Sequence, residues 1–265
     1  MFSWDKTGDR VAIVQMNAEL RHAQLELLSA QCATDRLRLR FSAEDIARHA
    51  QRDVLRRAVS SANALHDYYE YIAQQISQPD SLTNGDSSLS EDRIVDAIAR
   101  LSQYLREQRE QFATASEPLD VEHRQLMLPY FSPRLLEAVR TVKLQGRRVA
   151  NPSFFSEARA KGFTNLPDFT HMPSVSFEDV LVFHEDISSR PLFHALVHAV
   201  QFEVLGLQRY SELFVRAFLR TRSYVTVPLE AHAFTLELKF ASHAPEPFSV
   251  EEKVRLWANQ GRYEH

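Results

Sequence analysis

The stretch SSRPLFHALVHAVQFEVLG, residues 188–206, sets the organisation of the second half of this chain. His194 and His198 stand four positions apart, so on an α-helix they differ by only about 40° in direction and about 6 Å in height. Their imidazoles can therefore converge on one ion. Leucine, phenylalanine and valine fill the other faces, which indicates a helix buried at the centre of a domain.

Two histidines alone do not make a catalytic zinc site, because such a site typically has three protein ligands. The segment SYVTVPLEAHAFTLELKF, residues 223–240, is predicted to begin a helix at Pro228. Glu230 lies in its first turn, and Glu237 lies seven positions later on nearly the same face. Either carboxylate could supply the third ligand, whereas His232 is expected to point elsewhere.

Composition favours a helical protein with a real core. The chain has 265 residues, of which 44% are hydrophobic and only 6 are glycine, which suffices for one large domain or two small ones. We expect an α+β fold that is mostly helical. The single cysteine, Cys32, excludes an internal disulfide bond and a cysteine-rich zinc site.

The net charge and the hydropathy pattern limit the kinds of partner that are expected. The formal net charge of −4 provides no overall field that would attract nucleic acid or an anionic membrane surface. No apolar run has the length of a signal-peptide core or of a membrane span. We therefore expect a soluble, cytoplasmic protein that binds neither nucleic acid nor membrane, and whose partner is an unidentified protein or peptide.

The first part of the chain predicts a helical bundle. Apolar residues recur at spacings of three and four over residues 10–37 and 42–76, which is typical of two long amphipathic helices. A polar loop over residues 77–90 precedes a third predicted helix that runs to about Phe112. TASEPLD, residues 114–120, reads as a joint. We expect a bundle over residues 1–116 and a second domain over residues 117–265.

The second domain is predicted to mix strands and helices. Residues 138–146 alternate apolar and polar side chains, and residues 174–183 are rich in residues that favour strands, so a small sheet is expected. One short helix is expected around residues 152–161. Further predicted helices cover residues 191–205, 208–220, 228–240 and 249–257.

The run FHALVHAVQFEVLG (193–206), followed by YVTVPLEAHAF (224–234), resembles a bacterial zincin-like domain with the pattern HELVHVxQ…LG…Y…PLExxA. That domain is related to the glutamate-type zincin metallopeptidases. LPYFSPRLLEAVRTVKLQG (128–146) and SVSFEDVLVFHE (174–185) are similar to its first helix and strands. The resemblance covers about residues 128–245 and does not reach residues 1–115.

The resemblance implies a zinc site in which His194 and His198 are the histidine ligands and Glu230 is the acidic third ligand. Ala233 matches the small residue that lets the two helices approach. Ala195 departs from the pattern, because it stands where an active zincin carries the glutamate that takes a proton from the metal-bound water. The resemblance therefore implies a metal-binding but peptidase-inactive protein.

Few residues near the motif could replace the missing base. Glu203 lies nine positions after His194 and points away from it, and Gln201 lies on the correct face but is an amide. His184, Glu185 and Asp186, at the end of a predicted strand, are the candidates for an alternative base.

Three candidate cleft residues and two other functions stay open. Gln201, Tyr224 and Glu185 are candidates to line a cleft beside the metal. Histidines at this spacing could instead be core residues that bond Glu230 without metal. In that case the protein would be a metal-free scaffold acting through its amino-terminal bundle. The third alternative is an active zinc hydrolase that uses a different base.

Overall fold

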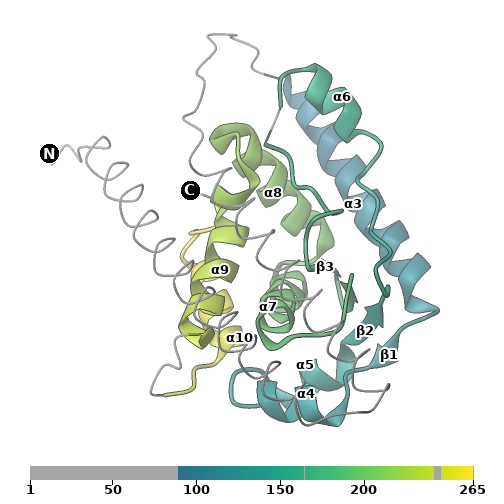
Figure 1. Ribbon diagram of the computed structural model, residues 1–265. Coiled ribbons are helices and arrows are strands. Elements are labelled where there is room, and N and C mark those ends of the chain that lie inside the picture. Colours follow the sequence, from purple (N-terminus) through teal and green to yellow (C-terminus); the bar gives the residue numbers. More distant parts are fainter. Residues whose placement is uncertain (1–88, 164, 242–245, 265) are drawn as a thin grey trace, which may run out of the picture. The chain divides into compact units, whose positions relative to one another are not determined.

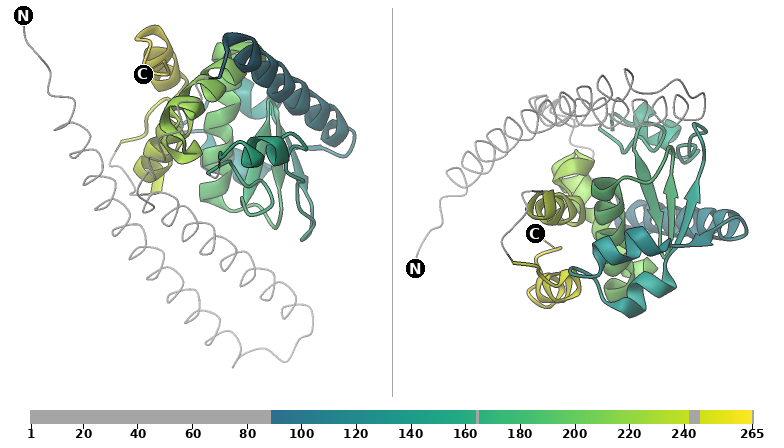
Figure 2. Two further views of the ribbon diagram at one scale, coloured as in Figure 1. Left: turned by 90° about the horizontal axis from the view of Figure 1, so that it is seen from above. Right: turned by 60° about the horizontal axis from the view of Figure 1, so that its bottom comes forward.

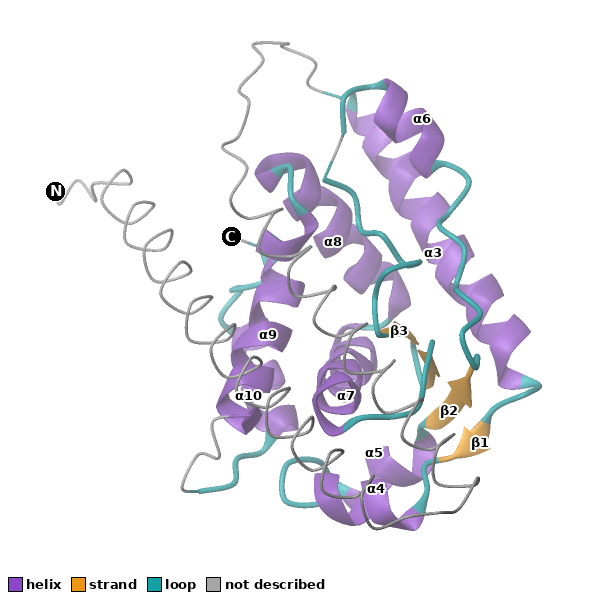
Figure 3. Cartoon of the chain, in the orientation of Figure 1, coloured by secondary structure: helices purple, strands orange, loops and turns teal. Residues whose placement is uncertain are grey.

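The computed structural model describes residues 89–163, 165–241 and 246–264. The chain divides into two compact units, Met1–Gln74 and Gln75–His265, and all described residues belong to the second. The helices predicted over residues 10–37 and 42–76 lie outside the described residues, as does Cys32. The expected fold class is confirmed for the described part, which is mostly helical and contains a small mixed sheet (Figure 3).

The elements follow one another in this order: α3 (Glu91–Ala113), β1 (Glu117–Pro118), α4 (Val121–Met127), α5 (Pro133–Ala138), β2 (Arg140–Lys143), α6 (Phe155–Ala160), β3 (Ser174–Phe177), β4 (Val180–Phe183), α7 (Ser189–Leu205), α8 (Leu207–Thr221), the 3-10 helix η1 (Tyr224–Thr226), α9 (Pro228–Ala241) and α10 (Val250–Asn259). The strands and the later helices predicted from the sequence are confirmed. β1 and α4 were not predicted from the sequence. No described helix combines the length and the apolar content that crossing a membrane requires.

The sheet has the strand order β1-β2-β4-β3. β2 pairs with β4 in parallel, while β1 pairs with β2 and β3 pairs with β4 in antiparallel fashion. The segment predicted as β-rich over residues 174–183 is thus a hairpin. Its turn contains Glu178 and Asp179, and Arg109 of α3 holds the Asp179 carboxylate with two hydrogen bonds of 2.6 and 2.9 Å.

Helices cover both faces of this sheet. Successive strand residues point to opposite faces. Ser176 donates to the carbonyl of Ala195 in α7 at 3.0 Å, whereas the ring of Phe177 stacks on Phe112 of α3. α7 therefore lies on one face and α3 on the other (Figure 1), and every residue of β4 between them is buried.

α3 belongs to this unit by its contacts. This helix was predicted as part of a bundle over residues 1–116. In the structure α3 packs on α8, β3 and β4, and the division between the two compact units lies between Gln74 and Gln75. The amphipathic pattern of α3 reveals that one face is buried. It carries no information on which partner covers that face, and the domain boundary near residue 117 stays a prediction.

α7 occupies the centre of the unit. It packs on β3 and β4 and also contacts α8, α9 and α10 (Figure 2), which explains its nearly continuous apolar sequence. Gly206 ends it with φ 74° and ψ 156°, a combination open essentially only to glycine. This backbone allows α8 to start at once and to turn back along α7.

Candidate metal centre

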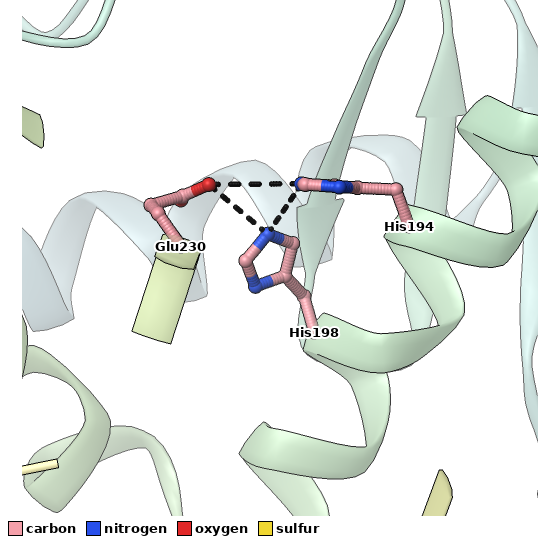
Figure 4. Close-up of side chains that lie close together, drawn as sticks. All are labelled: His194, His198 and Glu230. Carbon is pink, nitrogen blue, oxygen red and sulfur yellow. Dashed lines mark hydrogen bonds and ion pairs between the residues drawn. The ribbon is translucent and has the colours of Figure 1, made fainter. Parts of the chain in front are cut away.

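α7 and α9 bring together the three residues that the resemblance assigned to metal. In the described part of the chain, His194, His198 and Glu230 form a group that could hold a metal ion, and Figure 4 shows Glu230 reaching from α9 toward both histidines of α7. The Nε2 atoms of the two histidines are 3.0 Å apart. The Oε2 atom of Glu230 lies 3.6 Å from the Nε2 of His194 and 3.4 Å from that of His198.

A buried carboxylate orients the first histidine. The Nδ1 atom of His194 is 3.0 Å from the Oε2 of Glu237, and Arg190 donates from Nε to the other oxygen of that carboxylate at 3.0 Å. Burial would lower the pKa of His194, but hydrogen bonds with Glu230 and Glu237 outweigh it and raise the pKa to about 9. Glu237, the competing third ligand, thus binds the far side of the ring.

An amide orients the second histidine. The Nδ1 atom of His198 is 2.9 Å from the Oε1 of Gln201, while the amide nitrogen of Gln201 donates to the carbonyl of Leu229 at 3.0 Å. This second bond fixes which end of the amide faces the ring. The hydroxyl of Tyr210, in α8, lies 3.3 Å from the same Nδ1. Gln201, expected beside the site, therefore acts as an acceptor for His198.

These contacts leave three donor atoms directed at one point. With their Nδ1 atoms bonded to acceptors, both histidines turn Nε2 toward Glu230, as second-shell groups do in metal sites. Ligand atoms placed 2.0–2.1 Å from a tetrahedral zinc ion lie about 3.3 Å from one another. The separations of 3.0, 3.4 and 3.6 Å bracket that value. Two imidazole nitrogens and one carboxylate oxygen fit zinc in both type and spacing.

The group is almost closed to solvent. The side chains of His194, His198 and Glu230 are 12%, 9% and 11% exposed. Burial by itself opposes ionisation of Glu230, but the histidines beside it hold the pKa of this carboxyl well below its usual range. Glu230 is therefore an anion in a poorly hydrated site, which strengthens its attraction for a cation.

The structure gives two of the candidate bases, His184 and Glu185, other partners. Ala195 is 1% exposed and offers no proton acceptor in its side chain. The Nε2 of His184 accepts the backbone N–H of Val149 at 3.1 Å, and Glu185 pairs with Arg148 at 3.4 Å. Asp186 is exposed. Glu203 pairs with Arg134 of α5, in keeping with its predicted direction away from the histidines.

The remaining predicted residues lie as follows. Tyr224, in η1, is fully buried, so its side chain covers the core rather than lining an open cleft. His232 points away from the group and bonds Tyr263. Ala233 is fully buried in α9, which packs along α7.

Two residues that contact the centre, Arg190 and Tyr210, were not predicted from the sequence. Arg190 stands four positions before His194, so the i, i+4 spacing could have placed it on the same face. Tyr210 reaches His198 because the chain reverses at Gly206, and residue spacing does not predict where α8 then lies.

Comparison with known proteins adds no relative. No family model, curated protein or solved structure matches this chain. The roles of the residues in this centre therefore follow from the geometry of the site alone.

Proposed function

We propose that the protein binds one zinc ion through His194, His198 and Glu230 and has no peptidase activity. The observation that carries this proposal is the joint orientation of the two histidines. Glu237 and Gln201 hold their Nδ1 atoms, so both Nε2 atoms face the Glu230 carboxylate at separations suited to tetrahedral coordination. The resemblance of residues 193–206 and 224–234 to a zincin-like domain points the same way.

The lack of peptidase activity rests on Ala195. A zinc ion in this centre would act as a Lewis acid on a bound water or carbonyl. Peptide hydrolysis also needs a group that removes a proton from the water and returns it to the leaving amine, which contributes about 10² to 10⁴ in rate. A methyl side chain at position 195 does neither. His184 and Glu185, which could have served instead, are engaged by Val149 and Arg148.

A metal-free scaffold is the second candidate function, and one observation favours it. The two Nε2 atoms lie within hydrogen-bonding distance of each other, so a single shared proton would satisfy both rings without metal. The two functions differ in whether a divalent ion displaces that proton.

Elemental analysis decides between them. The full-length protein, without a histidine tag, is stripped with chelator, incubated with zinc, dialysed and measured. We expect about one equivalent of zinc in the wild type and a large loss in His194→Ala and Glu230→Gln. His171→Ala is the matched control, since His171 is an exposed histidine bonded to Asp168 outside the group. Absence of zinc from the native protein together with no uptake of added zinc would overturn the proposal.

Peptidase activity is tested separately on the zinc-loaded protein. We expect no cleavage of casein or of a peptide library above the level of His194→Ala. Cleavage by the wild type that His194→Ala abolishes would show that another group acts as the base, and would identify the protein as a hydrolase.

A further inference from the structure

The last described residues, 260–264, form an ordered turn after α10. We call them the carboxyl-terminal clasp. The backbone N–H of Arg262 donates to the carbonyl of Trp257 at 3.0 Å, and that of Glu264 donates to Gly261 at 3.0 Å. Gly261 has φ 65°, which glycine adopts without strain. The turn directs the following tyrosine inward.

Tyr263 joins the clasp to α9. Its side chain is 2% exposed, and its hydroxyl lies 2.7 Å from the Nδ1 of His232. The ring of His232 stacks on Trp257 of α10, with 3.8 Å between centroids and 3° between planes. Trp257 thus contacts the face of the His232 ring, and the Tyr263 hydroxyl contacts its edge.

Glu264 joins the clasp to α8. Its carbonyl accepts from Arg220 at 2.9 Å, and its carboxylate pairs with Arg209. Arg209 precedes Tyr210, whose hydroxyl contacts His198. The clasp therefore connects α8 and α9, which carry Tyr210 and Glu230 of the metal centre.

His232 and Glu230 lie on opposite sides of α9. Glu230 and His232 are two residues apart, so their directions differ by about 160° around α9. The metal centre holds one side of α9 and the clasp holds the other.

We infer that the clasp is a positioning element of the metal centre, in which Tyr263, through His232, sets the rotation of α9 and with it the place of the Glu230 carboxylate. This inference rests on the proposed function. Metal–ligand distances lie within about 0.2 Å of their usual values, and loss of an outer-shell partner typically weakens metal binding about 10- to 100-fold. A residue without contact to the ion can therefore control its affinity.

The test compares two tyrosine variants of the full-length protein. Tyr263→Phe removes the hydroxyl that meets His232. Tyr104→Phe is the matched control, because it removes a hydroxyl that bonds the carbonyl of Ala150 in another part of the unit. Zinc affinity is measured by competition with a chromophoric chelator, and the ligand geometry by the visible spectrum of the Co²⁺-loaded protein. We expect Tyr263→Phe to weaken zinc about tenfold and to shift the Co²⁺ bands, with Tyr104→Phe unchanged.

Each other outcome overturns the inference. Equal affinity and spectrum in Tyr263→Phe and wild type would mean that the clasp is structural only. Equal losses in both variants would indicate a general effect of lost stability. If the wild type binds neither Zn²⁺ nor Co²⁺, the proposed function itself is wrong. Should Tyr263→Phe not fold, His232→Gln, which alters the same contact from the other side, is measured in its place with the same expectations.

Discussion

The Nε2 atom of His194 lies 3.0 Å from the Nε2 atom of His198, and the Nδ1 atom of each ring already faces an acceptor oxygen. Two nitrogen lone pairs at this distance repel unless a proton lies between them. The metal-free centre therefore carries one proton more than two neutral imidazoles, at the place where an ion would bind.

Binding of zinc should accordingly release this proton. With the pKa of His194 raised to about 9, we expect zinc affinity to increase about tenfold per pH unit up to about pH 9, because metal competes with the proton. Calorimetric titrations at pH 7 in buffers of different ionisation enthalpy should give roughly one proton released per zinc. Identical enthalpies in all buffers would contradict this prediction.

Replacing Glu237 by glutamine should weaken metal binding without removing a ligand. The amide keeps the shape of the side chain but loses the charge that strengthens the Nδ1–H bond of His194, so we expect a loss of about 10- to 100-fold in zinc affinity. The substitution also removes the charge that pairs with Arg190 in a buried ion pair, so we expect the free energy of unfolding to fall by about 3 kcal/mol. Chelator competition and urea unfolding measure the two effects.

Glu203→Gln is the control for that experiment, since Glu203 is an exposed glutamate of α7 that pairs with Arg134, outside the metal centre. We expect it to change zinc affinity less than twofold and stability by less than about 0.5 kcal/mol. If Glu237→Gln behaved like Glu203→Gln, the assigned role of Glu237 would be wrong.

Ala195→Glu should return part of the missing chemistry to a zinc-loaded centre. Position 195 is buried, so without metal the added carboxylate should lower the free energy of unfolding. Zinc should then raise the free energy of unfolding by more in the variant than in the wild type. With zinc we expect detectable peptide hydrolysis. Ala195→Gln introduces the same bulk without a base, and equal rates in the two variants would show that the added carboxylate does not act.

His184 should make the protein sensitive to acid. Its Nε2 accepts the N–H of Val149, and burial together with the charge of Arg148 lowers its pKa to about 4. Between pH 4 and pH 6.5 the unfolded state binds more protons than the folded state, so stability falls as pH falls, by on the order of 2 kcal/mol. Urea unfolding of His184→Gln, which retains an acceptor near Nε2, should show a smaller pH dependence over this window; an unchanged slope would exclude His184.

The sequence alone placed His194 and His198 on one helix, while their role as metal ligands stays a prediction. The spacing of His194 and His198 on one helix is a local property, so residue counting was sufficient. The same counting left Glu230 and Glu237 as equals, because both lie on one face of α9. Only the relative placement of α7 and α9 separates them, with Glu230 near Nε2 and Glu237 near Nδ1 of His194.

The fold was predictable where periodicity was strong. α7, α8, α9 and α10 agree with the apolar pattern to within a few residues. β1, with two residues, and α4, with seven, are too short to leave a periodic signal. The element against which α3 packs could also not be predicted, since an apolar stripe is equally compatible with a bundle and with the α8 surface that it covers.

The contacts between α7 and α9 also bear on how fast an ion could be exchanged. Arg190 and Glu237 join the two helices at one end, and Gln201 and the Leu229 carbonyl join them at the other, so neither link needs a bound ion. The arrangement of the three ligand side chains should therefore be the same with and without an ion. The residence time of a metal would then depend on passage beside His194, whose ring lies 4.6 Å from that of Phe234, and small chelators should extract it faster than bulky ones.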